Sequence, residues 1–415
     1  METLHKDAAT LINRSIAANL PQEAVRNALK DRAFADSLYL VAIGKAAWTM
    51  AQAAQEALGD AVKAGFVITK YGHAEKPIPG LEIIEAGHPL SDENTILGTG
   101  KAVALARKLG KGDELLLLIS GGGSALFEKP LEGITLDDIV AVNNQLLASG
   151  ADIVEVNMIR KRLSAVKAGR FAQLCAPAKV FTVVLSDVLG DRLDSIASGP
   201  AAPDLSTAED ALAVVNKYKL VLNDRIRRYL TQETPKALDN VESVITGSVR
   251  TLCQSAAENA RALGYTPYVL CSDMNCEARD AGKLIGAIAR QIRQGNSGFK
   301  PPCALIFGGE TVVHLKGAGK GGRNQELALA AAEGIADMEG VLVFSVGSDG
   351  TDGPTDAAGG IVDGSTVRRL REKGLTIPAI LDNNDAYHGL EAVGGLIKTG
   401  PTGTNVNDIA VILHR

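Results

Sequence analysis

Short, wholly apolar runs alternate with amphipathic stretches along most of the chain. Residues 38–43 and 115–119 are runs of this kind, and residues 179–185 are apolar apart from Lys179 and Thr182. Such runs are typical of strands that are buried on both faces of a parallel sheet. The segments between them have the spacing of helices, with capping residues before them and glycines after several of them. This alternation of strands and helices predicts βαβ crossovers and a mostly parallel sheet.

The length of the chain and a polar break near its middle predict two α/β domains. The chain has 415 residues, more than one hydrophobic core usually supports. Residues 231–240 are polar and contain Pro235, so we place a linker there. The first domain (residues 1–235) is expected to be a Rossmann-like parallel sheet with helices on both faces. The second (residues 240–415) is expected to be α/β with a mixed sheet, including a tight hairpin of residues 304–307 and 311–315.

The composition favours a soluble cytoplasmic protein that does not bind nucleic acid or a membrane. Apolar residues make up 46% of the chain, and 43 basic against 48 acidic residues leave a formal charge of −5. This balance offers no basic surface for nucleic acid. Five scattered cysteines without a CxxC pair are expected to be free thiols in a reducing compartment. No apolar segment has the length of a membrane span, and residues 1–20 lack an apolar signal core.

Three glycines flanked by serines follow the apolar run at residues 115–119. The loop consists of Ser120, Gly121, Gly122, Gly123 and Ser124, and it stands at the carboxyl end of an expected strand, where open α/β sheets bind their ligands. Glycines leave backbone N–H groups uncovered, so the loop is suited to hold an anion such as phosphate. The alternative is a tight strand-to-helix turn, but one glycine would be enough for that. We therefore favour a phosphate loop.

Two cations stand where helices are expected to begin. Lys45 follows a buried strand and Gly44, and Arg323 follows the glycine-rich residues 317–322. A cation at the amino terminus of a helix is unfavourable to the helix dipole unless an anion binds beside it. The planar guanidinium of Arg323 also suits bidentate contact with a carboxylate or a phosphate. For both residues the alternative is an ordinary solvated side chain.

Aspartates follow two of the other expected strands. Asp187 and Asp191 frame the loop after residues 179–185, where a carboxylate could hold Mg²⁺ or accept a proton from a hydroxyl. Asp349 and Asp352 lie in a glycine-rich loop, where a metal or nucleotide contact competes with simple Asx turns. His88 precedes a proline and is expected to be structural. Glycine loops, single cations and aspartates suit phosphoryl transfer, because that reaction depends on positioning and charge neutralisation.

Residues 317–322 formally match the dinucleotide pattern GxGxxG. The strand expected before them is a hairpin arm, and the strand after them ends in Gly347 and Ser348 rather than in the acidic residue that binds ribose. The pattern is therefore weak support for a nicotinamide cofactor. No Walker A sequence, GxxxxGK[ST], occurs in the chain, which excludes a P-loop nucleotide site.

Eight short motifs, taken in order, give the sequence a specific resemblance. From about residue 41 to the end of the chain they resemble the glycerate 2-kinase family, also known as hydroxypyruvate reductase, whose carboxyl-terminal region (here about residues 300–415) is called the MOFRL domain. The motifs are GKAA from Gly44, GHP from Gly87, SGGGSAL from Ser120, SDVLGD from Ser186, SGP from Ser198, GGET from Gly308, GRNQE from Gly322 and SDGTDGPTD from Ser348.

The resemblance implies an ATP- and Mg²⁺-dependent kinase that phosphorylates the 2-hydroxyl of D-glycerate and gives 2-phosphoglycerate. It also implies an active site in the cleft between two α/β domains. We expect a monomer or a homodimer. The alternatives are an NAD(P)H-dependent hydroxypyruvate reductase and a two-lobed binding protein for a small acid. The resemblance leaves open whether the loop from Ser120 to Ser124 holds an ATP phosphate or the glycerate carboxylate.

Residue roles are carried over by matching motif. Lys45 and Arg323 would be the catalytic cations, and Asp187 would be the base or, with Asp191, a ligand of the metal. Nucleotide or metal contacts are implied for Ser120, Gly121, Gly122, Gly123, Ser124, Gly309, Glu310, Asp349 and Asp352. The sequence departs from the family at Arg162, where a histidine is usual, and at Ala168, where a glycine is common. The segment keeps its positive character, so we expect the substrate class to be unchanged, while the preference among hydroxy acids stays open.

Overall fold

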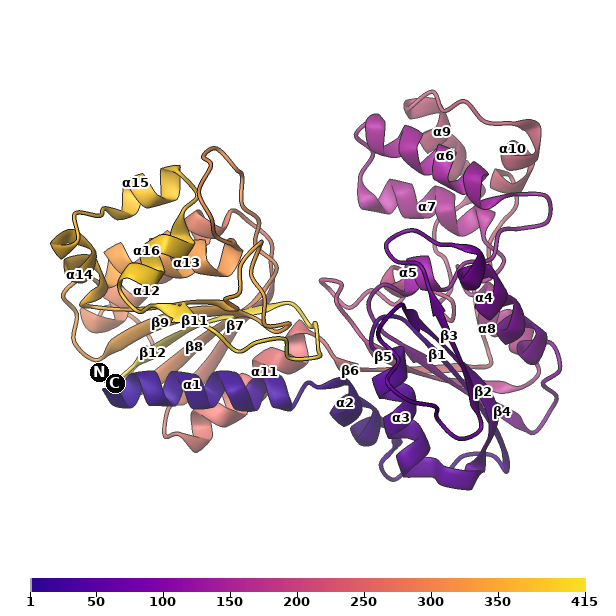
Figure 1. The fold of residues 1–415 in the computed structure, drawn as a ribbon, viewed down its shortest axis with the longest axis horizontal. Coiled ribbons are helices and arrows are strands. Elements are labelled where there is room, and N and C mark those ends of the chain that lie inside the picture. Colours follow the sequence, from indigo (N-terminus) through magenta and orange to yellow (C-terminus); the bar gives the residue numbers. More distant parts are fainter. Residues whose placement is uncertain (1) are drawn as a thin grey trace. The chain divides into compact units, whose positions relative to one another are not determined.

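Two six-stranded sheets organise residues 2–415, the part of the chain that the computed structural model describes (Figure 1). The parallel-sheet unit is Pro21–Thr246, and the mixed-sheet unit combines the residues up to Leu20 with Gly247–Arg415. The chain therefore passes from one unit to the other twice. This division differs from the predicted domains, 1–235 and 240–415, in the placement of the first helix and of the last strand of the parallel sheet.

The parallel sheet has the strand order β3-β2-β1-β4-β5-β6. The chain adds strands on one side of β1 and then returns to add β4, β5 and β6 on the other side, which is the Rossmann order, so the Rossmann-like prediction is confirmed. Ligands of open α/β sheets bind at this switch point, outside the carboxyl ends of the strands. The strands are β1 (Ser37–Ile43), β2 (Val62–Lys70), β3 (Leu81–Ala86), β4 (Asp113–Ile119), β5 (Lys179–Leu185) and β6 (Val241–Gly247), all parallel.

Helices cover both faces of the parallel sheet. Val41, Leu115 and Leu117 share one core with residues of α4 and α8. The alternate residues Leu40 and Leu116 are also fully buried and point to the opposite face. Burial on both faces explains the continuous apolar runs of the sequence. The helices around the parallel sheet are α2 (Pro21–Leu29), α3 (Ala47–Leu58), α4 (Glu93–Ala106), α5 (Gly123–Leu126) and α8 (Arg170–Cys175).

A helical layer with its own apolar core belongs to the parallel-sheet unit (Figure 1). It consists of α6 (Leu136–Ala148), α7 (Ile153–Leu163), α9 (Ala208–Lys217) and α10 (Asp224–Leu230). The side chain of Thr135 accepts a hydrogen bond from the backbone of Asp138 at the start of α6, as its capping sequence predicts. Residues 231–240 connect this layer to β6. The expected linker therefore lies inside the parallel-sheet unit.

The mixed sheet has the strand order β11-β10-β9-β12-β8-β7. Only β7 and β8 are parallel, and the last strand, β12, lies between β8 and β9 and is antiparallel to both. The predicted mixed sheet is confirmed, but the predicted hairpin is wrong: the apolar β12 takes the place beside β8, and residues 311–315 form no strand. The strands are β7 (Thr266–Met274), β8 (Cys303–Gly309), β9 (Val341–Gly347), β10 (Gly359–Asp363), β11 (Leu396–Ile397) and β12 (Asp408–His414).

The first helix of the chain packs on the mixed sheet. α1 (Glu2–Ala17) contacts α11 (Val249–Ala262) and β9, and Tyr265 donates a hydrogen bond to Asp7 at 2.7 Å. One core of the mixed sheet is built with α12 (Ala278–Arg293), α13 (Arg323–Ala332), α14 (Thr366–Glu372), α15 (Ile377–Asp382) and α16 (Ala386–Ala392). None of the helices within residues 2–415 is both long and apolar enough to cross a bilayer.

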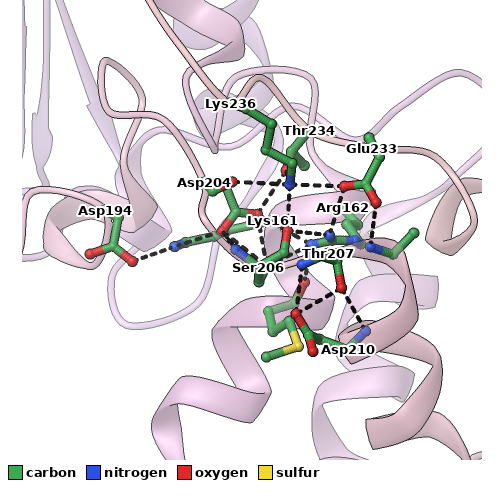
Figure 2. A network of polar contacts seen from close by, with 12 residues as sticks. Lys161, Arg162, Asp194, Asp204, Ser206, Thr207, Asp210, Glu233, Thr234 and Lys236 are labelled. Atoms are coloured by element: carbon green, nitrogen blue, oxygen red, sulfur yellow. Dashed lines mark hydrogen bonds and ion pairs between the residues drawn. The ribbon is translucent and has the colours of Figure 1, made fainter.

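Arg162 lies at the end of α7 inside a network of polar groups (Figure 2). It is completely buried. Its guanidinium lies 3.2 Å from the carboxylate of Asp204 and 2.9 Å from the hydroxyl of Ser206, and Thr234 donates to the same carboxylate at 3.0 Å. The network ties α7 to the segments before α9 and after α10. Since Arg162 has no exposed surface, its charge acts inside the fold and not on a substrate.

We expect Arg162→Met to lower the free energy of unfolding by about 3–5 kcal/mol, because it leaves the buried Asp204 carboxylate without its nearest cation. Urea denaturation measures the change. The matched control is Arg228→Met, which removes an exposed arginine of α10 and should change the stability by less than about 0.5 kcal/mol. An Arg162→Met protein as stable as its parent would contradict this account.

Ala168 has a φ of 54°, a left-handed conformation that a glycine adopts without strain. We expect Ala168→Gly to raise the free energy of unfolding by about 1 kcal/mol, because it removes the clash of the alanine Cβ with its own backbone. Ala172→Gly is the opposite control, since this residue lies within α8, where glycine is unfavourable. Both variants are compared by thermal and urea unfolding, and a loss of stability in Ala168→Gly would refute the strain.

Candidate active site

The glycine loop meets the turn after β1 at the switch point of the parallel sheet. The backbone N–H of Lys45 donates to the carbonyl of Gly121 at 2.8 Å, and that of Ala46 donates to the Ser120 hydroxyl at 3.0 Å. A Cβ at Gly44, whose φ is 115°, would lie only 2.3 Å from the Ser120 hydroxyl. The close approach of the two turns therefore requires glycine at this position.

Three side chains surround the glycines of this loop. A Cβ at Gly121 would lie 2.3 Å from a carboxylate oxygen of Asp187, and a Cβ at Gly122 would lie 3.0 Å from the His88 ring and 3.1 Å from Lys45 Cγ. The glycines leave the space that these groups occupy. The structure thus brings together Lys45, the glycine loop and Asp187, as three parallel strands that end at one edge would place them. His88, which the sequence suggested to be structural, also lies here.

The charges around the glycine loop influence one another. Burial raises the pKa of Asp187, and the ammonium of Lys45 partly opposes this shift. Burial and the charge of Lys45 lower the pKa of His88, which favours its neutral form. The Lys45 ammonium has no hydrogen bond or ion pair with any residue in 2–415. A free cation beside a carboxylate with a raised pKa suits both anion binding and proton transfer.

Asp191 offers an oxygen that the protein itself does not use. The residue has a φ of 53°, and its Oδ1 is buried without a hydrogen-bond partner among the described residues. Residues 2–415 contain no cluster of three or more His, Cys, Asp or Glu side chains that could hold a metal ion. Mg²⁺ commonly binds through one or two carboxylates and completes its shell with water and substrate phosphates. Asp191 offers one such carboxylate oxygen, and the metal site predicted for Asp187 and Asp191 together stays a prediction.

A second group of charged residues lies at one edge of the mixed sheet. Asp408 opens β12 and is paired with Gly309 of β8 and Gly347 of β9. Arg323, the first residue of α13, binds both oxygens of Asp408 at 2.5 and 3.1 Å and Glu310 at 2.9 Å. These bonds hold the plane of the guanidinium and leave two of its five N–H groups free. The predicted residues Arg323, Gly309 and Glu310 therefore lie together.

Asp408 is a residue that the sequence analysis missed. Its only signal is an acidic residue at the start of an apolar strand, and the position of that strand in the sheet is not visible in the sequence. Burial raises the pKa of Asp408, opposed by Arg323. Burial alone would lower the pKa of Arg323, but Asp408 and Glu310 raise it above its ordinary value. The arginine is therefore always charged.

Two of the three aspartates in the loop after β9, Asp349 and Asp352, accept hydrogen bonds from backbone N–H groups. Asp352 is only 3% exposed, and its carboxylate accepts the backbone N–H groups of Asn324 at 3.1 Å and Gln325 at 2.8 Å. Asp349 accepts the N–H of Thr351 at 3.0 Å, which is an Asx turn. Asp352 thus caps α13 and helps to place Arg323. The nucleotide contacts predicted for both aspartates stay predictions.

In the apparent dinucleotide pattern at residues 317–322, the N–H groups of residues 317–320 are occupied. Asn383, Asn384 and Asp385 accept hydrogen bonds of 2.7–3.3 Å from the backbone of residues 316–320. These are the groups that a pyrophosphate would need. A Cβ at Gly317 would lie 2.4 Å from the backbone of Asn383. The glycines therefore allow close packing within the unit.

Comparison with known proteins gives consistent matches over the chain. Residues 7–231 match a family described as a domain of unknown function (DUF4147), and residues 303–408 match the MOFRL family. A D-glycerate 2-kinase of Thermotoga maritima is 52% identical over 99% of this chain and 98% of that protein. A crystal structure of glycerate kinase from Thermotoga maritima has a TM-score of 0.96 at 52% identity, with 100% of both chains covered. A relative in Agrobacterium vitis, provisionally named hydroxypyruvate reductase, is 39% identical over 97% of this chain and 93% of that protein.

We expect Asp352 to make the protein less stable as the pH rises from about 4 to about 7. Burial raises the pKa of this carboxyl from 3.8 to about 7. Between these values the folded state binds a proton that the unfolded state has lost, so raising the pH favours unfolding. Asp352→Asn should remove this contribution, which urea unfolding at several pH values measures.

The control for this prediction is Asp280→Asn, which changes an exposed carboxylate of α12. It should leave the dependence of stability on pH close to that of the parent protein. The same dependence in Asp352→Asn and in the parent would rule out the protonation of Asp352 as its cause.

Proposed function

Because the chain belongs to the glycerate 2-kinase family, we propose that it transfers the γ-phosphoryl group of ATP to the 2-hydroxyl of D-glycerate and forms 2-phosphoglycerate. The observation that carries this proposal is the meeting of Lys45, the glycine loop and Asp187 at the switch point of the parallel sheet. An unpaired cation, a glycine-rich loop and a carboxylate suit phosphoryl transfer to an alcohol, which depends on positioning and charge neutralisation.

We assign the glycine loop and Lys45 to the phosphates of ATP. The absence of side chains at Gly121 and Gly122 lets Asp187, His88 and Lys45 come close to the loop, and its backbone N–H groups would bind phosphate oxygens beside them. The aliphatic part of the Lys45 side chain lies against Gly122, and its ammonium would neutralise charge on the transferring phosphoryl group. This assignment accounts for the lack of a Walker lysine, because the cation comes from the neighbouring strand end.

We assign Asp187 as the base that accepts the proton of the substrate hydroxyl. The 2-hydroxyl oxygen of D-glycerate would attack the γ-phosphorus while its proton passes to the Asp187 carboxylate and the bond to the ADP oxygen breaks. The raised pKa of Asp187 makes it a stronger base than an exposed aspartate. His88 is the nearby neutral group, and it would contribute a hydrogen bond without adding charge.

Mg²⁺ would be held by Asp191, whose buried oxygen has no partner in the described chain, and by Asp187 if that residue is a ligand instead of the base. The ion supplies charge neutralisation on phosphate oxygens. In the mixed-sheet unit, Arg323 would bind an anionic group through its free N–H groups, with Asp408 as its positioning residue. Glu310 and Asp349 are proposed nucleotide or metal contacts.

A nicotinamide-dependent reductase is the weaker candidate. Its main support was the pattern at residues 317–322, and the N–H groups of residues 317–320 are already bonded to residues 383–385. We also propose a cytoplasmic location, because all five cysteines are free. Three of them, Cys175, Cys253 and Cys303, are buried as expected, whereas Cys276 is exposed. The monomer or homodimer expected from the sequence stays a prediction.

We expect the protein to convert D-glycerate, ATP and Mg²⁺ to ADP and a phosphoglycerate whose phosphorylated carbon is identified as carbon 2 by phosphorus NMR. Lys45→Met should lower kcat by about 100-fold or more, because charge on the transferring group is no longer neutralised. Coupled ADP release measures the rate.

The matched control is Lys63→Met, an exposed lysine of the same unit, which should keep the parent rate. Oxidation of NADH with hydroxypyruvate in the absence of ATP consumption would overturn the kinase proposal. Full activity in Lys45→Met would instead overturn the role of Lys45.

A further inference from the structure

A buried lysine lies behind the glycine loop and takes no part in the proposed chemistry. Lys167 is completely buried. Its ammonium donates to the backbone carbonyl of Ser124 at 2.7 Å and forms an ion pair with Glu128. The other carboxylate oxygen of Glu128 is buried without a partner in the described chain. Lys167 thus joins the end of the glycine loop to a charge that has no contact with solvent.

Ser124 has a second contact, with a residue from another part of the chain. The hydroxyl of Ser198, which is fully buried, lies 2.9 Å from the hydroxyl of Ser124. Its neighbour Ala197 packs so closely on Gly123 that a Cβ there would lie 2.6 Å from the Ala197 Cβ. The two segments therefore hold Gly123 and Ser124 from the side of the protein interior.

The backbone that carries these contacts is strained. Ala197 and Ser198 have φ values of 50° and 61°, which are unfavourable for residues other than glycine. The strained segment is tied down by the N–H of Ala168, which donates to the Ser198 carbonyl at 3.1 Å. Ala168 directly follows Lys167, so the lysine and the strained serine belong to one hydrogen-bonded assembly. We call Lys167, Glu128 and Ser198 the loop brace.

The loop brace is a poor device for stability alone. A buried ion pair adds little stability compared with apolar residues of similar size, and left-handed backbone outside glycine costs free energy. The shared result of these unfavourable features is a fixed position for Ser124. Strain and buried charge of this kind are typical of sites where geometry has to be maintained.

We propose that Lys167 and Ser198 are positioning residues that hold the glycine loop in the shape that binds its anion. The proposal rests on the function assigned above, in which this loop binds the phosphates of ATP. Loss of the brace would let Gly123 and Ser124 move, so the N–H groups of the loop would no longer point at one place. The affinity of the loop for the anion should fall, while the affinity for a ligand that binds elsewhere should stay the same.

The test compares Lys167→Met/Glu128→Gln with Ser198→Ala. The double variant removes both buried charges, so no unpaired ion is left behind, and Ser198→Ala removes only the hydroxyl contact. We expect the KM for ATP to rise about tenfold or more in the double variant and about threefold in Ser198→Ala, with the KM for D-glycerate unchanged. Calorimetric titration with ADP should show the same loss of affinity without turnover.

Arg162→Met is the matched control, because it removes another fully buried cation of the same unit that does not touch the loop. It should alter the folded fraction, and so kcat, without altering either KM. If the double variant fails to fold, Ser198→Ala and Ser198→Gly, which also relieves the left-handed strain, carry the comparison.

The two proposals fail in different ways. An unchanged KM for both substrates and an unchanged affinity for ADP would overturn the loop brace. A rise in the KM for D-glycerate alone would support the brace and overturn the assignment of the loop to ATP. If the parent protein does not phosphorylate D-glycerate, the proposed function fails, and the titration with ADP still decides whether the brace supports an anion site.

Discussion

The close approach of two strand-end turns is the constraint on which the proposed site depends. β1 and β4 run parallel and in register, with Ile43 opposite Ile119, so both strands end at the same level. The absence of a side chain at Gly44 lets the Ser120 hydroxyl come within reach of the backbone at Ala46. The position of Lys45 is set by its own backbone bond to Gly121. This bond fixes the backbone of Lys45, while its ammonium has no partner among the described residues and is the cation that we assign to an anion.

The mixed sheet places its cation by a different principle. Arg323 is held by Asp408, and Asp408 is in place only because β12 lies between β8 and β9. Asp408 thus sets the orientation of a residue 85 positions before it. Asp352 supports the same arginine by capping the start of α13. A guanidinium held on one side by carboxylates is suited to present its remaining N–H groups in one fixed plane.

Local patterns in the sequence were enough to predict the parallel sheet and much of its site. Apolar runs identify the strands, and Lys45, the glycine loop and Asp187 each follow one, so the rule that parallel strands end at a common edge brings them together. Features that depend on contacts between segments far apart in the sequence were not predictable. The insertion of β12 replaced the expected hairpin and concealed Asp408, and the amphipathic pattern of α1 does not tell which sheet it covers. His88 approaches Gly122 only through the fold.

The charged residues also show why positive charge in a sequence does not by itself identify an anion site. The run from Arg160 to Arg162, with Lys167 nearby, is the most basic part of the parallel-sheet unit, yet Arg162 and Lys167 are completely buried and paired. Arg162 connects the segments of the helical layer, and Lys167 binds the end of the glycine loop. Lys45 stands alone in the sequence and is unpaired in the structure. The cation suited to bind a ligand is the one whose charge the fold has not already neutralised, and only the contacts reveal which one that is.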